Sequence, residues 1–499
     1  MLAQESEYRY DDATQLWRLT DNAAGLGIDK SRDRGYAEFS FEHREGDYHR
    51  VQEGGQRNCL TFTTERYQQI SMLLVSYGRL QFDMDRVKDR AWCDVMRPYN
   101  ANPYFSGSSI RGKYDTQDFD LTAAVSTIPI PLASQNMDRE LTLGVKLDYK
   151  VGDLSRLRDP RSRSQVLDYK LTPGAALTLG RHTIGLNGHY NRRKEKMPSL
   201  TTVQEDPNLA YYLMSGMEQT IGTIGGYKGF SREWVNHQFG AELNYNYQND
   251  KLNSLTTIGI SRGVEDAWGQ YKYEPGKYTS YRYKASTYNR IRSGALLHQL
   301  DAEAAFLQGY ADEYHQQLIQ ERDAEKGYTS YRYETQIEFR KRYQVKTADA
   351  AFHYQCAITD GTAIDGYAGI RFGMQHVKNV HLLPLSDFQY DHFNLQLEGG
   401  KSLLKKHLWI DLSATYHFSK NVVLNLADPN SAYAQGVWLS DMDFYRANYW
   451  QGHAELKYTF PLTIKKQPTQ WYAKAYGDFL KTNNHMDRKT IGFAIGIYN

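Results

Sequence analysis

The sequence predicts an all-β protein whose strands close into an antiparallel barrel that spans a membrane. Three observations lead to this fold class. Apolar and polar residues alternate over about ten or more positions in several segments, whereas strands of soluble proteins usually have about five or six residues. Mean hydropathy is low, at −0.68, although 13% of the residues are aromatic. Short turns also alternate with longer loops along the chain, which is typical of transmembrane barrels and indicates 14–18 strands, with short periplasmic turns and long extracellular loops.

The last stretch, residues 489–499 (KTIGFAIGIYN), shows the alternation most clearly. Its apolar face consists of Ile491, Phe493, Ile495 and Ile497. Its length suits a tilted membrane strand of roughly 9–11 residues. The stretch resembles the terminal strand of bacterial outer-membrane barrels, with Thr490 and Gly492 followed by Ile495 and Ile497 as the residues that assembly machinery reads. The alternative is the terminal strand of any antiparallel sheet.

Composition narrows the function classes. A net charge of +2 gives no field that would attract nucleic acid, and 40 tyrosines are not typical of a disordered chain. The sequence contains no apolar run of about 18 residues, which a transmembrane helix would need. Cys59, Cys93 and Cys356 lack metal-site spacing, and their odd number leaves open whether two of them form a disulfide.

The N-terminal residues do not alternate, so we predict a periplasmic or hatch-like segment over residues 1–34 and the barrel over residues 35–499. Asp11 can cap a short helix over residues 13–19. The opening Leu-Ala-Gln is similar to the end of a secretory signal peptide cut after Ala3, so we expect the true start to lie upstream.

Residues 21–27 (DNAAGLG) resemble the Asn-Pro-Ala-Gly-Leu motif of the long-chain fatty-acid channel family and related secretion barrels, although the proline is missing. The resemblance implies a segment that folds into the barrel as a hatch. The alternative is a helix that ends at Gly25 or Gly27.

The clearest predicted strands are residues 141–151, 167–179, 182–190, 239–247, 408–418 and 450–460. The polar faces of such strands should line or fill the lumen, and they carry the pairs Lys146/Asp148, Asp168/Lys170 and Glu455/Lys457.

The predicted connections are of several kinds. Loops are expected at residues 97–116 and 152–164, and a long extracellular loop at 419–447. Residues 481–487 should lie outside, and the short stretches 400–406 and 461–469, with the C-terminus, at the periplasmic rim.

The tyrosine-rich region has two notable features. Tyr310, Tyr314 and Leu318 recur every four residues, so a helix inside a loop is predicted over residues 309–327. YTSYRY occurs at residues 278–283 and again at 328–333, which indicates two similar strands or, alternatively, a paired aromatic surface outside the membrane.

No catalytic motif is present, and we predict neither an enzyme nor any catalytic, cofactor or metal residue. Asp391 and His392 are adjacent, and Asp441 and Asp443 lie in the long loop, but solvated loop charges explain them better. The pairs His376/His381 and His182/His189 could bind a metal, although lumenal or loop positions are the simpler interpretation. The basic stretches at residues 156–163 (RLRDPRSR) and 192–196 (RRKEK) are loops that could meet lipopolysaccharide phosphates.

Taken together, these features resemble an uncharacterised outer-membrane barrel family of Bacteroidota, whose members sit near TonB-dependent transporters and surface lipoproteins. The resemblance implies the outer membrane of a Gram-negative bacterium, with its lipids and lipopolysaccharide as partners, and possible contact with such a transporter or lipoprotein. Two functions remain: a transport pore or accessory subunit of a larger uptake or assembly complex, and a barrel enzyme acting on lipid or peptide. A secreted β-protein is the third interpretation.

Overall fold

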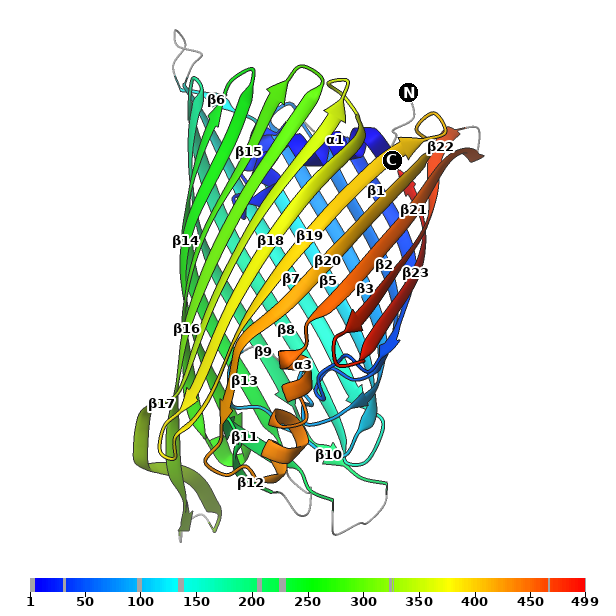
Figure 1. The fold of residues 1–499 in the computed structure, drawn as a ribbon. Helices are drawn as coiled ribbons and strands as arrows, with labels where there is room; N and C mark the ends of the chain where they lie inside the picture. The colour runs from blue at the N-terminus through cyan, green and yellow to red at the C-terminus, as the bar shows by residue number, and fades with distance from the viewer. Residues whose placement is uncertain are drawn as a thin grey trace.

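The computed structural model describes residues 5–29, 33–96, 101–132, 139–203, 209–223, 230–322, 325, 327–464 and 467–498. They form a closed antiparallel barrel of 18 strands, as predicted (Figure 1). The barrel strands are β1 (Arg34–Gly46), β2 (Gln56–Gln69), β3 (Leu74–Arg90), β5 (Gly112–Thr127), β7 (Arg139–Arg156), β8 (Arg161–Leu179), β9 (His182–Met197), β13 (Arg232–Gln248), β14 (Leu252–Gly269), β15 (Gly276–Ser293), β16 (Leu296–Arg322), β17 (Thr329–Thr359), β18 (Ile364–His381), β19 (Ser386–Leu403), β20 (Leu408–Asn425), β21 (Tyr449–Ile464), β22 (Gln467–Thr482) and β23 (Asp487–Tyr498).

Shorter elements lie inside the barrel or in its connections. The short strands are β4 (Ser106–Gly107), β6 (Ile130–Pro131), β10 (Leu200–Thr201), β11 (Tyr212–Gly216) and β12 (Gln219–Thr223). The helices are α1 (Glu5–Thr14), η1 (Leu16–Leu19), α2 (Gly25–Ile28), η2 (Gln270–Lys272), η3 (Ala434–Trp438) and α3 (Met442–Arg446). No described helix has both the length and the apolar character needed to cross a membrane.

The barrel closes where the first strand meets the last. β1 pairs with β23 over most of its length, from Tyr36 opposite Tyr498 to Gly46 opposite Arg488. The apolar face predicted for the C-terminal stretch points outward, with Phe493 58% exposed. On the inner face, the rings of Tyr472 and Tyr476 cross Gly496 and Gly492, where a Cβ atom would lie only 2.2 and 2.0 Å from them. The glycines therefore let the tyrosines lie flat on the inner wall.

Exposed apolar side chains cover the outer wall on all sides. They include Phe39, Leu121, Leu186, Leu243, Ile258, Phe372, Leu412 and Ile495. In a soluble protein such a continuous apolar surface would be unusual, because exposed patches rarely exceed a few hundred Å². The alternation within each strand therefore places apolar residues outside and polar residues inside, the pattern of a barrel in lipid.

The two ends of the barrel differ. The end that carries both termini has short connections, such as Gly180–Arg181 between β8 and β9, and we name it the turn end (Figure 1). The opposite, loop end carries residues 47–55, 198–203, 209–223 and 426–448. Residues 400–406 thus lie at the same end as the end of β23 and residues 481–487 at the opposite end, as predicted.

Several predicted loops are strands. β7 and β8 continue to Arg156 and from Arg161, so the predicted loop at 152–164 shrinks to a tight connection. The basic stretch 192–196 lies within β9, paired on both sides. Residues 112–116 belong to β5, and residues 97–100 of that predicted loop lie outside the described part.

Two helix predictions were wrong. Residues 309–322 form part of β16 instead of a helix, because side chains four apart share a face in a strand as well as in a helix. The N-terminal helix is α1, Glu5–Thr14, followed by the 3₁₀ turn η1, so Asp11 lies inside a helix and does not cap one. Gly25 likewise begins α2, against the alternative that it ends a helix.

Candidate functional site: a lumenal chamber between plug and cap

Residues 5–29, which we name the plug, lie inside the barrel at the turn end (Figure 1). α1 is anchored by charge. Glu5 forms an ion pair of 2.7 Å with Lys457, and the Arg9 guanidinium donates two hydrogen bonds of 2.6 and 3.2 Å to Asp411. Burial opposes the ionisation of Glu5, but Lys457 and Arg9 outweigh it and lower the pKa of Glu5 to about 2.

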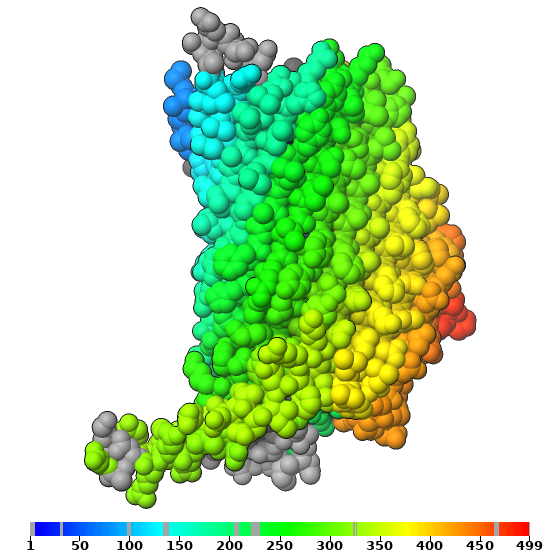
Figure 2. Space-filling model, turned by 90° about the vertical axis from the view of Figure 1, so that its left-hand side faces the viewer, coloured from blue at the N-terminus to red at the C-terminus, as the bar shows by residue number. Residues whose placement is uncertain are grey.

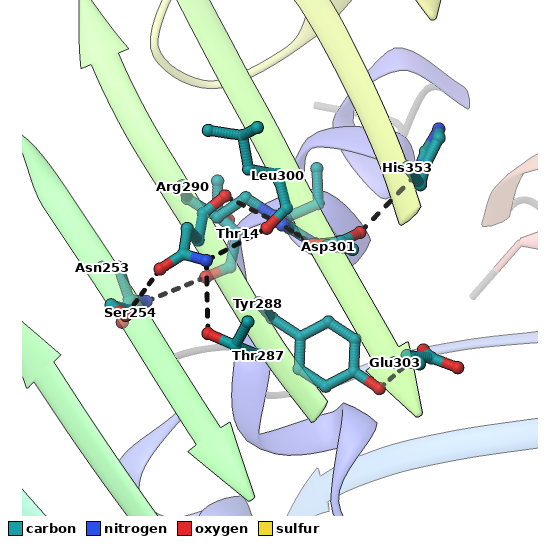
Figure 3. Close-up of polar contacts among 12 residues, drawn as sticks. Thr14, Asn253, Ser254, Thr287, Tyr288, Arg290, Leu300, Asp301, Glu303 and His353 are labelled. Carbon is teal, nitrogen blue, oxygen red and sulfur yellow. Dashed lines mark hydrogen bonds and ion pairs between the residues drawn. The ribbon is translucent and has the colours of Figure 1, made fainter. Parts of the chain in front are cut away.

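The middle of the plug is held through its backbone carbonyls (Figure 3). The Arg290 side chain donates to the Ala13 carbonyl at 2.5 Å, and Asn253 donates to the Thr14 carbonyl at 3.4 Å. Arg290 is fixed in turn by Asp301, which also faces His353 at 3.6 Å. Carbonyls at the end of α1, which lack partners within the helix, are thereby satisfied by the wall.

The innermost part of the plug is centred on Asp21. Its carboxylate lies 2.6 Å from Lys170, 3.2 Å from Lys146 and 3.9 Å from Lys284. Although burial opposes ionisation, these lysines hold the pKa of Asp21 well below its usual range. The next residue, Asn22, donates hydrogen bonds of 3.1 Å to the Ala175 carbonyl and to the Asn244 side chain.

Glycines let the plug touch the wall closely. A Cβ atom on Gly144 would lie 2.5 Å from the backbone of the plug at Ala23 and Ala24, and one on Gly174 would lie 2.2 Å from Asn22 Oδ1. On the plug side, a Cβ on Gly27 would lie 1.9 Å from the Thr127 carbonyl oxygen. The DNAAGLG stretch is therefore fitted to the inner wall, and Lys146 and Lys170, which the sequence places on lumenal strand faces, both reach Asp21.

The loop end carries a second body, which we name the cap: residues 47–55, 91–96, 101–111, 209–218 and 426–448. The cap has an apolar core shared with the wall. Among its buried members are Trp92, Tyr104, Tyr211, Tyr433 and Met442.

Two buried carboxyl groups tie the cap segments together. Asp441 accepts a hydrogen bond of 2.8 Å from the Val51 N–H, and burial raises the pKa of Asp441 to about 7. Glu218 accepts hydrogen bonds from Ser386 Oγ at 2.6 Å and from the Ala427 N–H at 3.0 Å. These contacts join loops that are far apart in sequence.

Between plug and cap, the lumen holds two cavities of about 680 and 720 Å³. The first is next to Asp21, and its wall is rich in charged residues. The second lies beneath the cap and is rich in aromatic residues: Tyr48, Tyr288, Tyr390, Phe444, Tyr445 and Tyr449. Thr20, Arg282 and Lys284 line both cavities, so we treat them as one chamber.

Positive charge in this chamber is incompletely neutralised. Within the described part of the chain, no carboxylate lies within 4 Å of the guanidinium groups of Arg79, Arg282 or Arg488. Arg488 instead lies over the ring of Tyr48, 5.4 Å from its centre. In the same half of the chamber, the rings of His417 and Tyr449 stack at 4.5 Å. The chamber therefore offers guanidinium donors and aromatic faces to a solute.

The candidate residues taken from the sequence do not assemble into a catalytic site. Asp391 points to the outer wall, where it bonds His376 at 2.6 Å, whereas His392 lines the chamber. Asp441 is buried in the cap, so its interpretation as a solvated loop charge was wrong, and Asp443 is exposed.

The other candidates are also dispersed. His381 is buried 3.8 Å from Glu313 in the cap region, His182 contacts the Tyr245 ring near the turn end, and His189 lines the chamber. Among the described residues, no group of three His, Cys, Asp or Glu side chains could hold a metal ion, and the three cysteines are free.

The basic stretches lie largely in strands instead of loops, and they expose some of their cations, such as Arg161, Arg163 and Lys196, while burying others. Arg156 is buried and donates to the Tyr114 hydroxyl at 2.7 Å, and Arg193 is buried against Glu195. Neither arginine can meet a lipid phosphate.

The model of a family of unknown function, DUF6850, matches residues 23–499. The chain belongs to this family. No curated protein matches this DUF6850 member. Its fold is similar to the outer membrane transporter YddB from Escherichia coli, with TM-score 0.40, 9% identity and coverage of 94% of this chain and 81% of the other. It is also similar to the ferric yersiniabactin uptake receptor FyuA from Yersinia pestis, with TM-score 0.41, 8% identity and coverage of 94% and 81%. A third is the siderophore receptor PirA from Acinetobacter baumannii, with TM-score 0.39, 8% identity and the same coverage.

Proposed function

We propose that this chain is a gated transport barrel of a Gram-negative outer membrane, and that its chamber takes a small acidic solute when the plug moves. The observation that carries the proposal is the plug itself: a segment inside the lumen, held to the wall through ion pairs, hydrogen bonds and small apolar clusters. Closed barrels and helices are the structures that satisfy every backbone group in lipid, and the apolar outer wall supports that location.

The unpaired arginines support the choice of solute. A guanidinium group presents donors in a fork that matches a carboxylate or a phosphate, and Arg282 lies where the two cavities meet. The charges near Asp21 are already satisfied by the plug, so an acidic solute competing for Lys146, Lys170 and Lys284 would also loosen the plug. Solute and gate are thereby coupled through shared lysines.

Conductance in planar bilayers tests the proposal. We expect the intact chain to conduct little, and a variant lacking residues 5–29 to conduct steadily with a preference for anions. In the deleted background, Arg282→Ala should lower the anion preference, whereas Arg262→Ala, an equal charge change outside the chamber, should leave it unchanged. A deleted barrel that does not conduct would show that the cap alone seals the lumen and would overturn the transport role.

We also propose lipopolysaccharide and other outer-membrane lipids as partners. A groove of about 400 Å³ on the outer wall has an apolar floor of Phe119, Val151 and Leu167, with Lys194 and Lys196 beside it toward the loop end. An acyl chain fits the floor and a phosphate the lysines. Lys196→Gln should lower the lipopolysaccharide retained on purification, measured by native mass spectrometry. A TonB-dependent transporter and surface lipoproteins stay predicted partners on the resemblance alone.

A further inference from the structure

One hairpin rises well beyond the rest of the barrel. β15 pairs with β16 only as far as Glu313, and β18 pairs with β17 only from Tyr343 onward. Beyond these points β16 and β17 continue to pair with each other alone, from Glu313 opposite Phe339 to Arg322 opposite Thr329. Figures 1 and 2 show this arm projecting past the loop end and sideways from the wall.

The arm is supported on one side. In the adjoining β14–β15 connection, Tyr271 packs against Tyr331 with ring centres 5.2 Å apart, and Tyr273 packs against Tyr333 at 5.0 Å. The backbone N–H of Glu274 also donates to the Gln316 side chain at 2.7 Å. The Tyr314 N–H donates to the Pro275 carbonyl at 2.8 Å as well, so the connection follows the edge of β16 at the base of the arm. Tyr331 and Tyr333 belong to β17, so the same connection also packs against one face of the arm and leaves the outer backbone edge of β17 unpaired.

The β17 side of the arm is open. Within the described residues, no strand pairs with the outer edge of Thr329–Arg340, so its N–H and C=O groups face solvent. Proteins usually protect such edges with Pro, Lys or bulges. This stretch, TSYRYETQIEFR, contains neither Pro nor Lys, and its exposed side chains include Tyr331 and Ile337. A bulge lies at Gln336, because Ile337 pairs with His315 and Thr335 with Gln316, but the pairing from Thr329 to Thr335 is regular. The edge is thus built to accept another strand.

The sequence of the edge is self-complementary. If two copies pair in antiparallel fashion about Tyr333, Arg332 of each faces Glu334 of the other, and Tyr331 faces Thr335. Opposite charges, paired aromatics and aromatic–β-branched pairs all stabilise antiparallel strands. Moving the centre by one residue would instead place Glu334 opposite Glu334 or Arg332 opposite Arg332.

We infer that the β17 edge of the arm pairs with the same edge of a second copy, and that the chain is a twofold dimer at the cell surface. Both barrels stand in one membrane, so the twofold axis runs along the membrane normal. A sideways-leaning arm meets its copy head to head about such an axis, which gives the antiparallel order. The interface is isologous and closes on itself, so it yields a dimer and no fibre. This inference goes beyond the proposed transport role.

A charge swap tests the pairing. Arg332→Glu and Glu334→Arg each place like charges opposite each other twice, and we expect at least a tenfold weaker dimer in detergent, followed by light scattering with size-exclusion chromatography. The double swap restores opposite charges and should restore the dimer. Glu321→Gln is the matched control, because Glu321 forms an exposed ion pair of 2.9 Å with Arg332 inside one arm. It should leave the dimer unchanged.

Cross-linking gives a second readout in native membranes. Directly opposed residues in antiparallel strands have Cα atoms about 4.5 or 5.5 Å apart, and both distances suit a disulfide. Tyr333→Cys should form a covalent dimer on mild oxidation, whereas Leu318→Cys, on the supported strand, should not. Heat-dependent gel mobility confirms that each variant is a folded barrel. A monomer in all folded variants, or a double swap no better than the single changes, would overturn the inference, as would a Tyr333→Cys cross-link to another protein only.

Discussion

Removing the carboxylate of Asp21 is the most direct perturbation of the plug. The carboxylate is 24% exposed and forms ion pairs with Lys170 at 2.6 Å and Lys146 at 3.2 Å. A hydrogen bond to a charged group contributes about 1.5–3 kcal/mol, and partial exposure reduces each of the two. Asp21→Ala also leaves the two ammonium groups close together without a counter-charge. We therefore expect docking of the plug to weaken by about 3 kcal/mol, which is a shift of about 150-fold in its equilibrium.

The matched control is Asp12→Ala, which removes the same charge from the same plug. Asp12 is 61% exposed and pairs with Arg18 and Arg34 at the surface, so its loss should cost less than about 1 kcal/mol. Open probability in planar bilayers and hydrogen exchange of the plug amides both report docking. If Asp21→Ala and Asp12→Ala raise them equally, or neither does, then the lysine cluster does not hold the plug and the gating argument is wrong.

Three further predictions concern the cap, the plug fit and the outer wall. Because the pKa of Asp441 rises from 3.8 to about 7 on folding, the cap retains a proton that the unfolded chain releases, and cap stability should fall as pH rises through that window. Asp441→Asn should remove this fall in cap stability, which the rate of protease cleavage within residues 426–448 would measure. Gly27→Leu would drive a side chain into the Thr127 carbonyl and should raise conductance, whereas Gly452→Ala, with nothing within 4 Å, should not. Ile260→Arg should destabilise the barrel in vesicles by about 2–4 kcal/mol if this exposed position faces lipid, and leave it unchanged if it faces water.

The strands were predictable because lipid outside and charge inside impose the same alternation on each of them. The stretch 141–151 illustrates this, since Leu143 and Val145 are exposed outside while Lys146 reaches the plug. Strand ends were harder. β7 and β16 continue past the apolar band into water, where the alternation fades but the backbone ladder does not. The alternation of side chains can be read from a sequence, whereas the backbone pairing between strands cannot.

The site was less predictable than the fold, for a physical reason. α1 is mostly polar, and its position depends on partners such as Lys457 and Asp411, more than 400 positions away. No local pattern encodes such contacts. The spacing of Tyr310 and Tyr314 fits a helix and a strand equally well, and only pairing with β15 and β17 decides between them. The small residues of DNAAGLG were the one local sign of close packing against a wall.

The plug and the cap differ in the free energy that displacing each of them would cost. Opening the cap would expose an apolar core that includes Trp92, Tyr211 and Tyr433, and burial of such groups contributes about 25 cal/mol per Å². Withdrawing the plug would also expose apolar side chains, Leu16 and Trp17 among them, but it separates in addition ion pairs such as that of Asp21 with Lys170, whose partners water can solvate afterwards. Salt and competing anions weaken the ion pairs of the plug and leave the apolar core of the cap intact. We therefore expect the plug to be displaced more readily than the cap, and an acidic solute in the chamber to compete with Asp21 for the lysines that hold the plug.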